Sequence, residues 1–256
     1  MDLSIIVPIY NGANSVDNSV NSILRHYRER NTDCELIVVD DCSTDDTEVR
    51  LKDLQVLNPE LHIVRNLKNQ GKGYSIRQGF LHCTGDMILF TDADLPYGMD
   101  GLDAVFDTLN RGADVAIGSR VHPNSRYTMH SQHFPYIFFR HVLGRMLVAF
   151  ANQLFQLHVS DTQCGIKGFR KIVGATILPN VNSRRFAFDI EFLSIARHFK
   201  WTIEEVPVNL SYAGQKTTVK IMRDSYIVLR DLLKIKFSNI SGDRKATPLH
   251  GKGVDV

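Results

Sequence analysis

Long apolar runs, paired cysteines and familiar glycine signatures are missing from this sequence of 256 residues. No stretch reaches the roughly 18 successive apolar residues that a membrane-spanning helix needs. The apolar opening, Leu3–Ile9, is too short for a signal peptide. The four cysteines show no C-x-x-C spacing, which argues against a zinc site or a disulfide framework and favours reduced thiols. We therefore expect a cytoplasmic protein with no membrane span of its own.

Two nucleotide-binding glycine patterns are absent as well. The segment Gly71-Lys72-Gly73 looks like a phosphate-binding loop, but it fits neither G-x-x-x-x-G-K-[ST] nor G-x-G-x-x-G. These absences argue against a P-loop ATPase and against a dinucleotide-dependent enzyme. A chain of this length with 43% hydrophobic residues can nevertheless bury a sizeable core, as ordinary globular proteins do.

What the sequence does contain is a regular alternation of strands and helices. Apolar stretches indicate strands at Leu3–Ile9, Glu35–Val39, His62–Arg65, Met87–Thr91 and Ala113–Ser119, and a later one at Glu204–Leu210. Residues at helical spacing separate the strands, and Asn14 or Ser15 offers an N-cap to the first helix. This alternation predicts an α/β fold, namely a doubly wound, mostly parallel sheet with helices on both faces.

Polar residues follow each of the first five predicted strands. The segments are Tyr10-Asn11, Asp40-Asp41, Asn69–Gly73, Asp92–Asp94 and Ser119-Arg120. Because the carboxyl ends of parallel strands meet at one edge of a sheet, where ligands bind in open α/β folds, we expect these segments to lie together. The sequence therefore predicts one polar binding edge.

The paired aspartates of Thr91-Asp92-Ala93-Asp94 are the sharpest signal on that edge. Two carboxylates at a strand end suit Mg²⁺ or Mn²⁺, which take oxygen ligands together with substrate phosphates. The competing interpretation is structural, since Asp-x-Asp often opens a turn or caps a helix. Nearby, Tyr10 offers a flat face for a base, and Lys72 and Arg120 can neutralise phosphate charge. A metal-bound diphosphate fits this set better than a free anion.

The second half of the chain has a different character. No acidic residue occurs from Val121 to Ser160. Within this stretch, Tyr136–Leu157 is a long helical run that either packs on the sheet or lies in a membrane interface, and both interpretations stay open. A basic helical segment at Lys220–Phe237 completes the expected C-terminal amphipathic helices. The polar residues 241–256 are expected to form a flexible tail.

Several ordered motifs make the chain similar to a known family. They are Pro8-Ile9-Tyr10-Asn11, Val38–Asp45, Asn69–Gly73, Thr91–Asp94 and Gly118-Ser119-Arg120. In this order they resemble the family 2 glycosyltransferases, which have the Rossmann-like GT-A fold. Two further motifs, Asp161–Lys167 and Gly214-Gln215-Lys216, are similar to those of the dolichyl-phosphate β-glucosyltransferases and their bacterial relatives. The resemblance implies a single domain over 1–240, with a nucleotide-binding half (1–120) and an acceptor half (121–240).

The resemblance implies an inverting, metal-dependent transfer of a sugar, expected to be glucose from UDP-glucose, to a polyprenyl or dolichyl phosphate. The expected partners are the nucleotide-sugar donor, the polyprenyl phosphate and the cytoplasmic face of the membrane, on which the protein would lie. Nucleic acid is not expected as a partner. Mg²⁺ or Mn²⁺ would be held by Asp92 and Asp94. Donor contacts are expected from Pro8, Tyr10, Asn11, Val39, Asp40, Asp41, Gly71, Lys72, Asp92, Ala93, Asp94, Arg120 and Lys216.

Residues for the chemistry and for the acceptor follow from the same resemblance. The expected catalytic residues are Asp94, Arg120, Asp161 and Glu191, and the acceptor phosphate would be held by Arg126, Arg140 and Arg145. Asp161 is either a general base or a residue that fixes its own loop. Of Asp189 and Glu191, we expect Glu191 to face the site.

Two other functions stay open. The first is a soluble GT-A glycosyltransferase that acts on a hydroxyl of a glycan, protein or small molecule. A hydroxyl must be deprotonated, so Asp161 or Glu191 would then be indispensable. A phosphate oxygen is already anionic at pH 7 and needs only positioning and charge neutralisation. The second is a non-catalytic nucleotide-sugar-binding protein.

Overall fold

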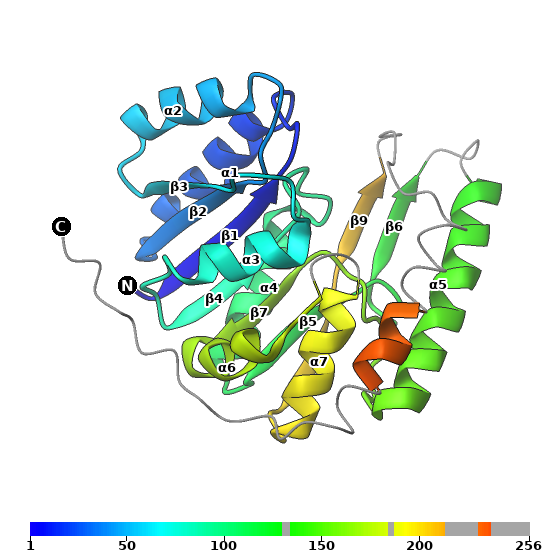
Figure 1. The fold of residues 1–256 in the computed structure, drawn as a ribbon. Helices are drawn as coiled ribbons and strands as arrows, with labels where there is room; N and C mark the ends of the chain where they lie inside the picture. Colours follow the sequence, from blue (N-terminus) through cyan, green and yellow to red (C-terminus); the bar gives the residue numbers. More distant parts are fainter. Residues whose placement is uncertain (130–133, 184–186, 213–229, 237–256) are drawn as a thin grey trace.

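Most strands of the molecule form one twisted sheet with helices on either side (Figure 1). The computed structural model describes residues 1–129, 134–183, 187–212 and 230–236. The strands are β1 (Leu3–Ile9), β2 (Cys34–Asp40), β3 (Leu61–Arg65), β4 (Met87–Phe90), β5 (Val115–Ser119), β6 (Arg126–Met129), β7 (Lys167–Arg170), β8 (Ile203–Pro207) and β9 (Asn209–Tyr212). The helices are α1 (Val16–Glu29), α2 (Thr47–Leu57), α3 (Lys72–Phe80), α4 (Gly98–Asn110), α5 (Phe134–Phe155), α6 (Lys171–Ile177), the 3-10 helix η2 (Leu178–Asn180) and α7 (Phe188–His198). Residues 230–236 are also helical.

The direction of the strands determines where their ends lie. In the described residues the main sheet has the order β3-β2-β1-β4-β7-β5-β8. β1 is parallel to β2 and β4, β2 to β3, and β5 to β8. β7 runs antiparallel to both of its neighbours, β4 and β5. The carboxyl ends of β1 to β5 and the start of β7 therefore share one edge, and the predicted α/β fold with a mostly parallel sheet is confirmed.

Alternate residues of the strands face two separate cores. In β1, Ile5 and Val7 pack beneath α1, α2 and α4, whereas Ile6 packs beneath α3, α6 and α7. The second core contains buried phenylalanines, among them Phe169 and Phe192, whose ring centroids lie 5.2 Å apart. Truncating such a residue to alanine typically costs about 3–5 kcal/mol, so this core holds the sheet and α7 together. Helices on both faces were predicted from the sequence.

Helices α1 and α3 begin at the binding edge in different ways. Ser15 is the N-cap residue of α1, as expected, but its side chain makes no cap bond and instead donates its hydroxyl to the Gly12 carbonyl. Helix α3 begins after Gly71, whose φ of 91° lies in the left-handed region that favours glycine. This glycine lets the chain turn sharply into α3 beside the strand ends.

The strand predicted at Glu204–Leu210 is two strands in different sheets. β8 ends at Pro207 in the main sheet, and β9 pairs with β6 in a separate, two-stranded parallel sheet. The break falls at Val208, whose N–H donates to Ser125 Oγ and whose carbonyl accepts the N–H of Arg126. These bonds draw the chain away from the main sheet, which the apolar alternation of the sequence could not reveal.

Helix α5 confirms the helix predicted at Tyr136–Leu157, with both ends shifted. Its last turns pack on the core, where Ala151 is buried and Leu147 and Leu154 are partly buried. Leu232 and Ile235, from the helix at 230–236, join the same core. In the part of the chain that the structure describes, no helix is both long and apolar enough to cross a membrane. The remainder of the predicted Lys220–Phe237 helix and the tail 241–256 lie outside the described residues.

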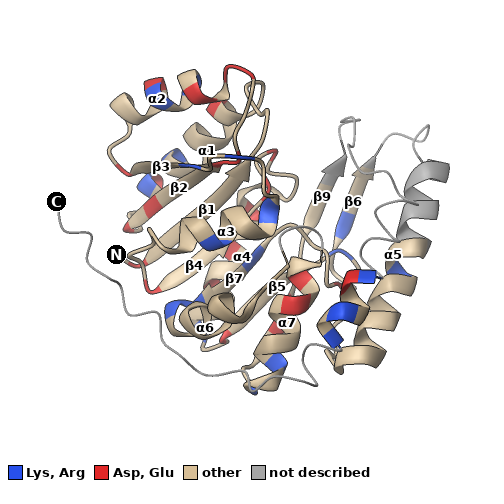
Figure 2. Cartoon of the chain, in the orientation of Figure 1, with Lys and Arg blue, Asp and Glu red and all other residues tan. Residues whose placement is uncertain are grey.

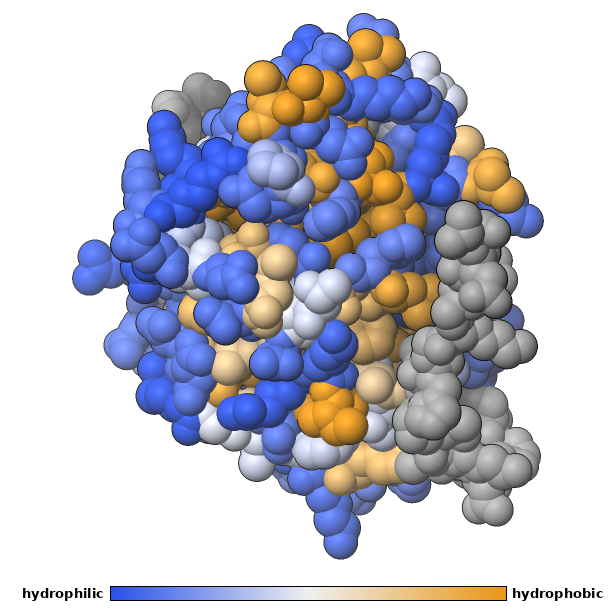
Figure 3. Space-filling view, turned by 90° about the vertical axis from the view of Figure 1, so that its left-hand side faces the viewer, coloured by the Kyte–Doolittle hydropathy of each residue, from blue (hydrophilic) through white to orange (hydrophobic). Residues whose placement is uncertain are grey.

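Charge and hydropathy distinguish two sides of the molecule. Lysine and arginine predominate among the charged residues of β6, α5 and residues 230–236 (Figure 2). The side that carries α2 and β3, seen in Figure 3, shows apolar patches separated by hydrophilic residues. Exposed apolar residues in this part of the chain are Val49, Val56, Leu57 and Leu67.

Candidate active site

Hydrogen bonds join the segments that follow the first strands of the sheet. Asn11, after β1, donates its N–H to Ser43 Oγ at 2.9 Å and accepts the N–H of Thr44 at 2.8 Å. Asp41, after β2, accepts the N–H of Gly71 at 2.7 Å. These bonds link the segments after β1, β2 and β3, so three of the five polar segments predicted to share one edge lie together there.

Three residues on this edge are expected to bind the nucleoside. The ring of Tyr10 is accessible, whereas the carboxylates of Asp40 and Asp41 are already bonded within the protein. Tyr10 is 49% exposed and leaves its ring free for a base. Asp40, in contrast, is buried, accepts the N–H of Ser43 at 2.8 Å and lies 3.3 Å from Nη1 of Arg65. Asp41 is buried beneath the loop that it holds. Both aspartates therefore shape the loops beside Tyr10, and their direct contact with a nucleoside stays a prediction.

Other residues expected to contact the donor differ in what they can offer. Val39 is fully buried in the core beneath α3, so its side chain cannot reach a ligand and that expectation is corrected. Pro8 is half-buried at the end of β1. The carbonyl of Ala93 accepts the hydroxyl of Ser19, which ties the loop after β4 to α1. Lys216 lies outside the described residues.

Asp92 and Asp94 lie in the loop directly after β4, and Lys72 is their cationic neighbour. Asp92 Oδ1 accepts a hydrogen bond from Lys72 Nζ at 2.5 Å. Burial, and next the charge of Asp92, raise the pKa of Asp94 above its ordinary value. Burial opposes the charge of Lys72, but the attraction of Asp92 and Asp189 outweighs it and raises the pKa of the lysine. Two close carboxylates repel each other, and a shared cation relieves that repulsion.

The aspartate pair therefore fits a divalent cation by its chemistry. Carboxylate oxygens are the ligands that Mg²⁺ and Mn²⁺ take, usually with phosphate oxygens and water completing the shell. Among the described residues, no group of three or more histidine, cysteine, aspartate or glutamate side chains gathers as a metal site. A cation on Asp92 and Asp94 would thus draw its other ligands from the donor and from solvent.

Gly165 brings a third segment to this pair. It belongs to the loop before β7, and a Cβ at this position would overlap the carboxylate of Asp92. Its N–H donates to the hydroxyl of Tyr97 at 3.3 Å. The motif Asp161–Lys167 therefore packs directly on the predicted metal ligand, and any larger residue at Gly165 would have to displace that carboxylate.

Arg120 and Asp161 form a two-pronged ion pair across the loops after β5 and before β7. The Arg120 side chain donates from Nε to Asp161 Oδ2 at 2.7 Å and from Nη2 to Oδ1 at 2.9 Å. Burial would raise the pKa of Asp161, but its hydrogen bonds and attraction to Arg120 lower the pKa to about 2. Burial likewise opposes the charge of Arg120, yet Asp161 holds the pKa of Arg120 well above its usual range. The side chain of Arg120 is still 25% exposed and can meet an anion.

Glu205 supports the same loop from β8. Its carboxylate accepts the N–H groups of Ser160 and Asp161 at 2.9–3.1 Å and the hydroxyl of Ser160 at 2.6 Å. Of the two roles left open for Asp161, this geometry favours loop fixation, since a buried carboxylate that is held by an arginine is a weak base. Sequence reasoning missed Glu205, because nothing in a strand pattern marks which glutamate will receive backbone N–H groups.

A buried ion pair lies beneath the aspartates and was also missed. Lys167, fully buried, donates to Asp189 Oδ1 at 2.6 Å and to the carbonyl of Cys164 at 2.7 Å. Glu191 instead accepts the N–H groups of residues 182 and 183 at 2.7–3.1 Å. Glu191 is thus engaged by the backbone that precedes α7, and its role in catalysis stays a prediction. Asp189 is the member of this pair that acts electrostatically on Lys72.

Two of the three arginines expected to hold the acceptor phosphate have side chains that the structure describes. Arg126, on β6, and Arg145, on α5, are exposed, and the side chain of Arg140 lies outside the described residues. Burial raises the pKa of Tyr127, and Arg120 lowers it by a smaller amount, which places β6 beside Arg120. No contact in the described residues joins Arg145 to the strand ends. Their role at the acceptor stays a prediction.

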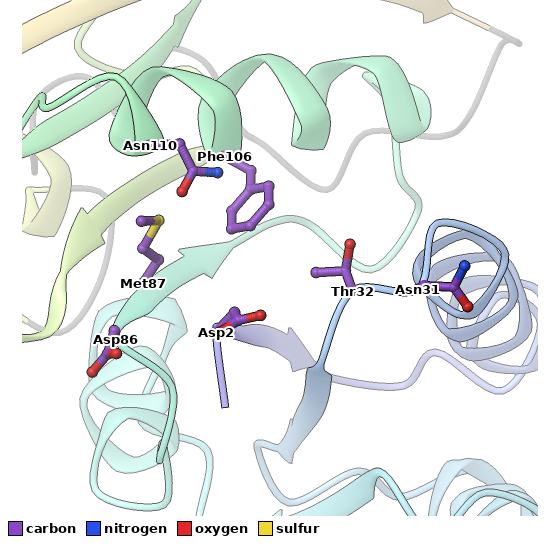
Figure 4. A pocket seen from close by; sticks show the side chains of 7 residues that line it. All are labelled: Asp2, Asn31, Thr32, Asp86, Met87, Phe106 and Asn110. Atoms are coloured by element: carbon purple, nitrogen blue, oxygen red, sulfur yellow. The ribbon is translucent and has the colours of Figure 1, made fainter.

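A cavity of about 330 Å³ lies at the opposite edge of the sheet (Figure 4). It is lined by Asp2, Asn31, Thr32, Asp86, Met87, Phe106 and Asn110. Asp2, Asn31 and Asp86 precede the strands β1, β2 and β4, so the cavity is a strand length away from the aspartate pair. Its lining has carboxylates but no lysine or arginine, which makes it unsuited to a nucleoside diphosphate.

Comparisons with known proteins identify the family of the chain. The family model described as glycosyl transferase family 2 matches residues 4–173. A dolichyl-phosphate beta-glucosyltransferase of Saccharomyces cerevisiae is 26% identical over 94% of this chain and 75% of its own length. The Homo sapiens protein of the same name is 30% identical over 94% of this chain and 76% of its own length. The chain thus spans about three quarters of the length of these two relatives.

Solved structures with the same fold come from a more distant protein. Glucosyl-3-phosphoglycerate synthase of Mycobacterium tuberculosis, in complex with Mn²⁺, UDP and glucosyl-3-phosphoglycerate, aligns with a TM-score of 0.67 at 18% identity. The alignment covers 92% of this chain and 80% of that one. The same synthase with Mg²⁺ and UDP aligns with a TM-score of 0.67 at 16% identity. These likenesses establish the fold that the sequence motifs had indicated.

Proposed function

The chain belongs to glycosyl transferase family 2 and is a glycosyltransferase, and on this premise we propose that it transfers glucose from UDP-glucose to a polyprenyl phosphate of the dolichyl phosphate kind. The transfer inverts the configuration at the anomeric carbon and depends on Mg²⁺ or Mn²⁺. The relatives named above support the sugar and the lipid, and the synthase crystallised with UDP and Mn²⁺ supports the nucleotide and the cation.

One observation carries the choice of a phosphate acceptor. The two carboxylates that could have served as general bases, Asp161 and Glu191, are both engaged within the protein. The pKa of Asp161, lowered to about 2, makes it too weak a base to deprotonate a sugar hydroxyl. A phosphate monoester is already anionic at pH 7, so this site suits it without any base.

The bond changes of the proposed reaction are simple. The bond from the sugar C1 to the diphosphate oxygen breaks, and its electron pair leaves with UDP. A lone pair of the acceptor phosphate forms the new bond to C1 from the opposite face, which inverts the configuration. Lys72 and Arg120 neutralise the departing diphosphate, and Tyr10 stacks on the base. A divalent cation on Asp92 and Asp94 supplies further charge neutralisation when bound.

Contact with a membrane follows from a lipid acceptor, and we assign it to the side of α5. There, exposed basic and apolar residues alternate on two helices, namely Arg145 and Met146 on α5, and Arg230, Leu233 and Lys234 on the helix at 230–236. Such a surface suits an interface with anionic headgroups, to which each basic residue adds about 1 kcal/mol of attraction. Cosedimentation should increase with the anionic lipid content of vesicles; binding that ignores lipid charge would contradict this assignment.

The reaction is tested with a panel of donors and acceptors. Purified protein with Mg²⁺ or Mn²⁺ is mixed with UDP- and GDP-sugars, with and without a short polyprenyl phosphate, and release of the nucleoside diphosphate is measured. Release with UDP-glucose only when the lipid is present is the expected result. Equal release with a glycan or a small hydroxyl compound in place of the lipid would refute the phosphate acceptor, and UDP binding without any release would refute catalysis.

A further inference from the structure

The ion pair between Lys72 and Asp92 lies where the proposed cation would bind. Lys72 Nζ is 2.5 Å from Asp92 Oδ1, and both side chains are partly exposed at the edge. Below them, Nζ also lies 5.7 Å from the centroid of the Phe90 ring, which stabilises an ammonium group from beneath. The position of Lys72 is thus well defined without any ligand.

The two oxygens of Asp92 have different neighbours. Oδ2 is the atom that a Cβ at Gly165 would overlap, so the backbone before β7 lies against that side of the carboxylate. Oδ1 is the oxygen that the ammonium of Lys72 already contacts, so a cation that binds there meets the lysine. Mg²⁺ binds a carboxylate oxygen at about 2.0–2.1 Å, so a cation of this kind and a lysine ammonium on the same oxygen would repel strongly.

A second anion, Asp189, acts on Lys72. Asp189 attracts Lys72 electrostatically and is itself held by Lys167 at 2.6 Å. Lys167 lies 5.8 Å from the centroid of the same Phe90 ring. Because Asp189 is fixed in the core, Lys72 keeps a nearby negative charge when it leaves Asp92. The ammonium of Lys72 is therefore compensated by a nearby carboxylate both before and after it leaves Asp92.

We propose that Lys72 occupies, in the donor-free protein, the side of Asp92 on which the divalent cation binds, and that it moves to the donor diphosphate when cation and nucleotide enter. Lys72 then competes with the cation in the absence of nucleotide and assists it in the presence of nucleotide. The inference rests on the proposed binding of a nucleotide sugar and a metal ion at this site. It adds that Lys72 leaves the carboxylate of Asp92 when the cation and the nucleotide bind.

The test measures Mn²⁺ binding directly rather than turnover. The dissociation constant of Mn²⁺ is determined by electron paramagnetic resonance of the free ion, with and without UDP, for the wild type and for Lys72→Met. Lys72→Gln serves as a second variant with a polar side chain. Lys68→Met is the matched control, because Lys68 is an exposed lysine of the same loop with no ion pair among the described contacts.

The expected result is a change of opposite sign in the two conditions. Without UDP, Lys72→Met should bind Mn²⁺ about tenfold more tightly than the wild type, because its competitor is gone. With UDP, the same variant should bind Mn²⁺ more weakly than the wild type, because the lysine no longer helps to hold the diphosphate. Lys68→Met should leave both constants within about twofold of the wild type.

Three results would overturn the inference. A Mn²⁺ affinity that Lys72→Met leaves unchanged without UDP would show that the lysine does not compete. Tighter binding by the same factor in both conditions would indicate a general charge effect without any exchange of partners. Failure of the wild type to bind Mn²⁺ even with UDP is distinguishable from both, since it would remove the proposed metal dependence itself.

Discussion

Gly165 packs against the carboxylate of Asp92 so closely that any side chain at this glycine would overlap it. The contact joins two segments that are far apart in the sequence, the loop before β7 and the loop after β4. It means that the orientation of the predicted metal ligand depends on a residue outside the aspartate motif. Four predictions follow from this contact and from the ion pairs around it.

Gly165→Ala should impair the reaction without unfolding the protein. The backbone of Gly165 does not need the left-handed region, so the effect comes from the new methyl group, which must displace Asp92. We expect UDP release to fall by about 100-fold, the effect of a shift of about 1 Å in a reacting group. Overpacking should lower the free energy of unfolding by only about 1–3 kcal/mol.

The matched control for this change is Gly144→Ala in α5. A Cβ at Gly144 meets no atom within 4 Å, so activity should stay at the level of the wild type. Equal activity of the two alanine variants, measured as UDP release at saturating donor, would show that the position of Asp92 does not matter.

Removal of the aspartate charges should abolish the response to metal. In the variants Asp92→Asn and Asp94→Asn, UDP release at saturating Mn²⁺ should fall by about 10²–10³, which is typical for the loss of one electrostatic stabiliser. A chelator should stop the wild type and excess Mn²⁺ should restore it. Turnover that persists in the chelator, or in the double variant, would refute the metal assignment.

Asp161→Asn should destabilise the fold in a way that depends on pH. The pKa of Asp161 falls from 3.8 to about 2 in the folded protein, which corresponds to about 2 kcal/mol of stability. Because the folded value is the lower one, this contribution is complete above about pH 4 and disappears as the pH falls toward 2. Urea unfolding of both proteins at pH 7, 4 and 3 measures it, and the difference between them should shrink at the lower pH.

Asp17→Asn is the comparison for this experiment. Asp17 pairs with Arg50 between α1 and α2, and both side chains are 46% exposed, so its replacement should cost less than about 1 kcal/mol. If both asparagine variants lost the same stability at pH 7, the pair of Arg120 and Asp161 would not be the strong contact that its geometry indicates.

The buried pair of Lys167 and Asp189 should behave as a unit. Lys167→Met leaves the carboxylate of Asp189 buried without its partner, and Asp189→Leu leaves the ammonium of Lys167 in the same state. Each should cost about 3–5 kcal/mol, whereas the double variant should recover most of that loss. Thermal or urea unfolding of the four proteins provides the cycle, and additive losses would contradict the coupling.

Much of the fold was predictable because its signals are local. A stretch such as Leu3–Ile9 is apolar on both faces, and this marks a central strand whatever surrounds it. The shared edge of the strand ends followed from parallel topology alone. The reversed strand β7 and the break at Val208 were not predicted, since both depend on hydrogen bonds to distant segments.

The site was predictable in its position more than in its contacts. The aspartates after β4 could be recognised because two acids follow an apolar run, but the partner of each charge could not. Arg120 and Asp161 are 41 residues apart, and Lys167 and Asp189 are 22 apart, so their pairing is decided by the fold. The same limit applies to Glu191, because its bonds to the N–H groups of residues 182 and 183 depend on the fold.

The antiparallel direction of β7 has a consequence for how such enzymes diversify. Most of the segments proposed to hold the nucleotide come from residues up to Asp94, with Arg120 and Lys216 as the exceptions, whereas those near the proposed acceptor come from Val115 onward. β7 lies between β4 and β5 in the sheet, so the two groups of segments meet along this strand. Recombination within α4, which connects β4 to β5, could therefore combine one nucleotide-sugar module with a new acceptor module. The new acceptor module would still need a glycine before β7 to pack against Asp92.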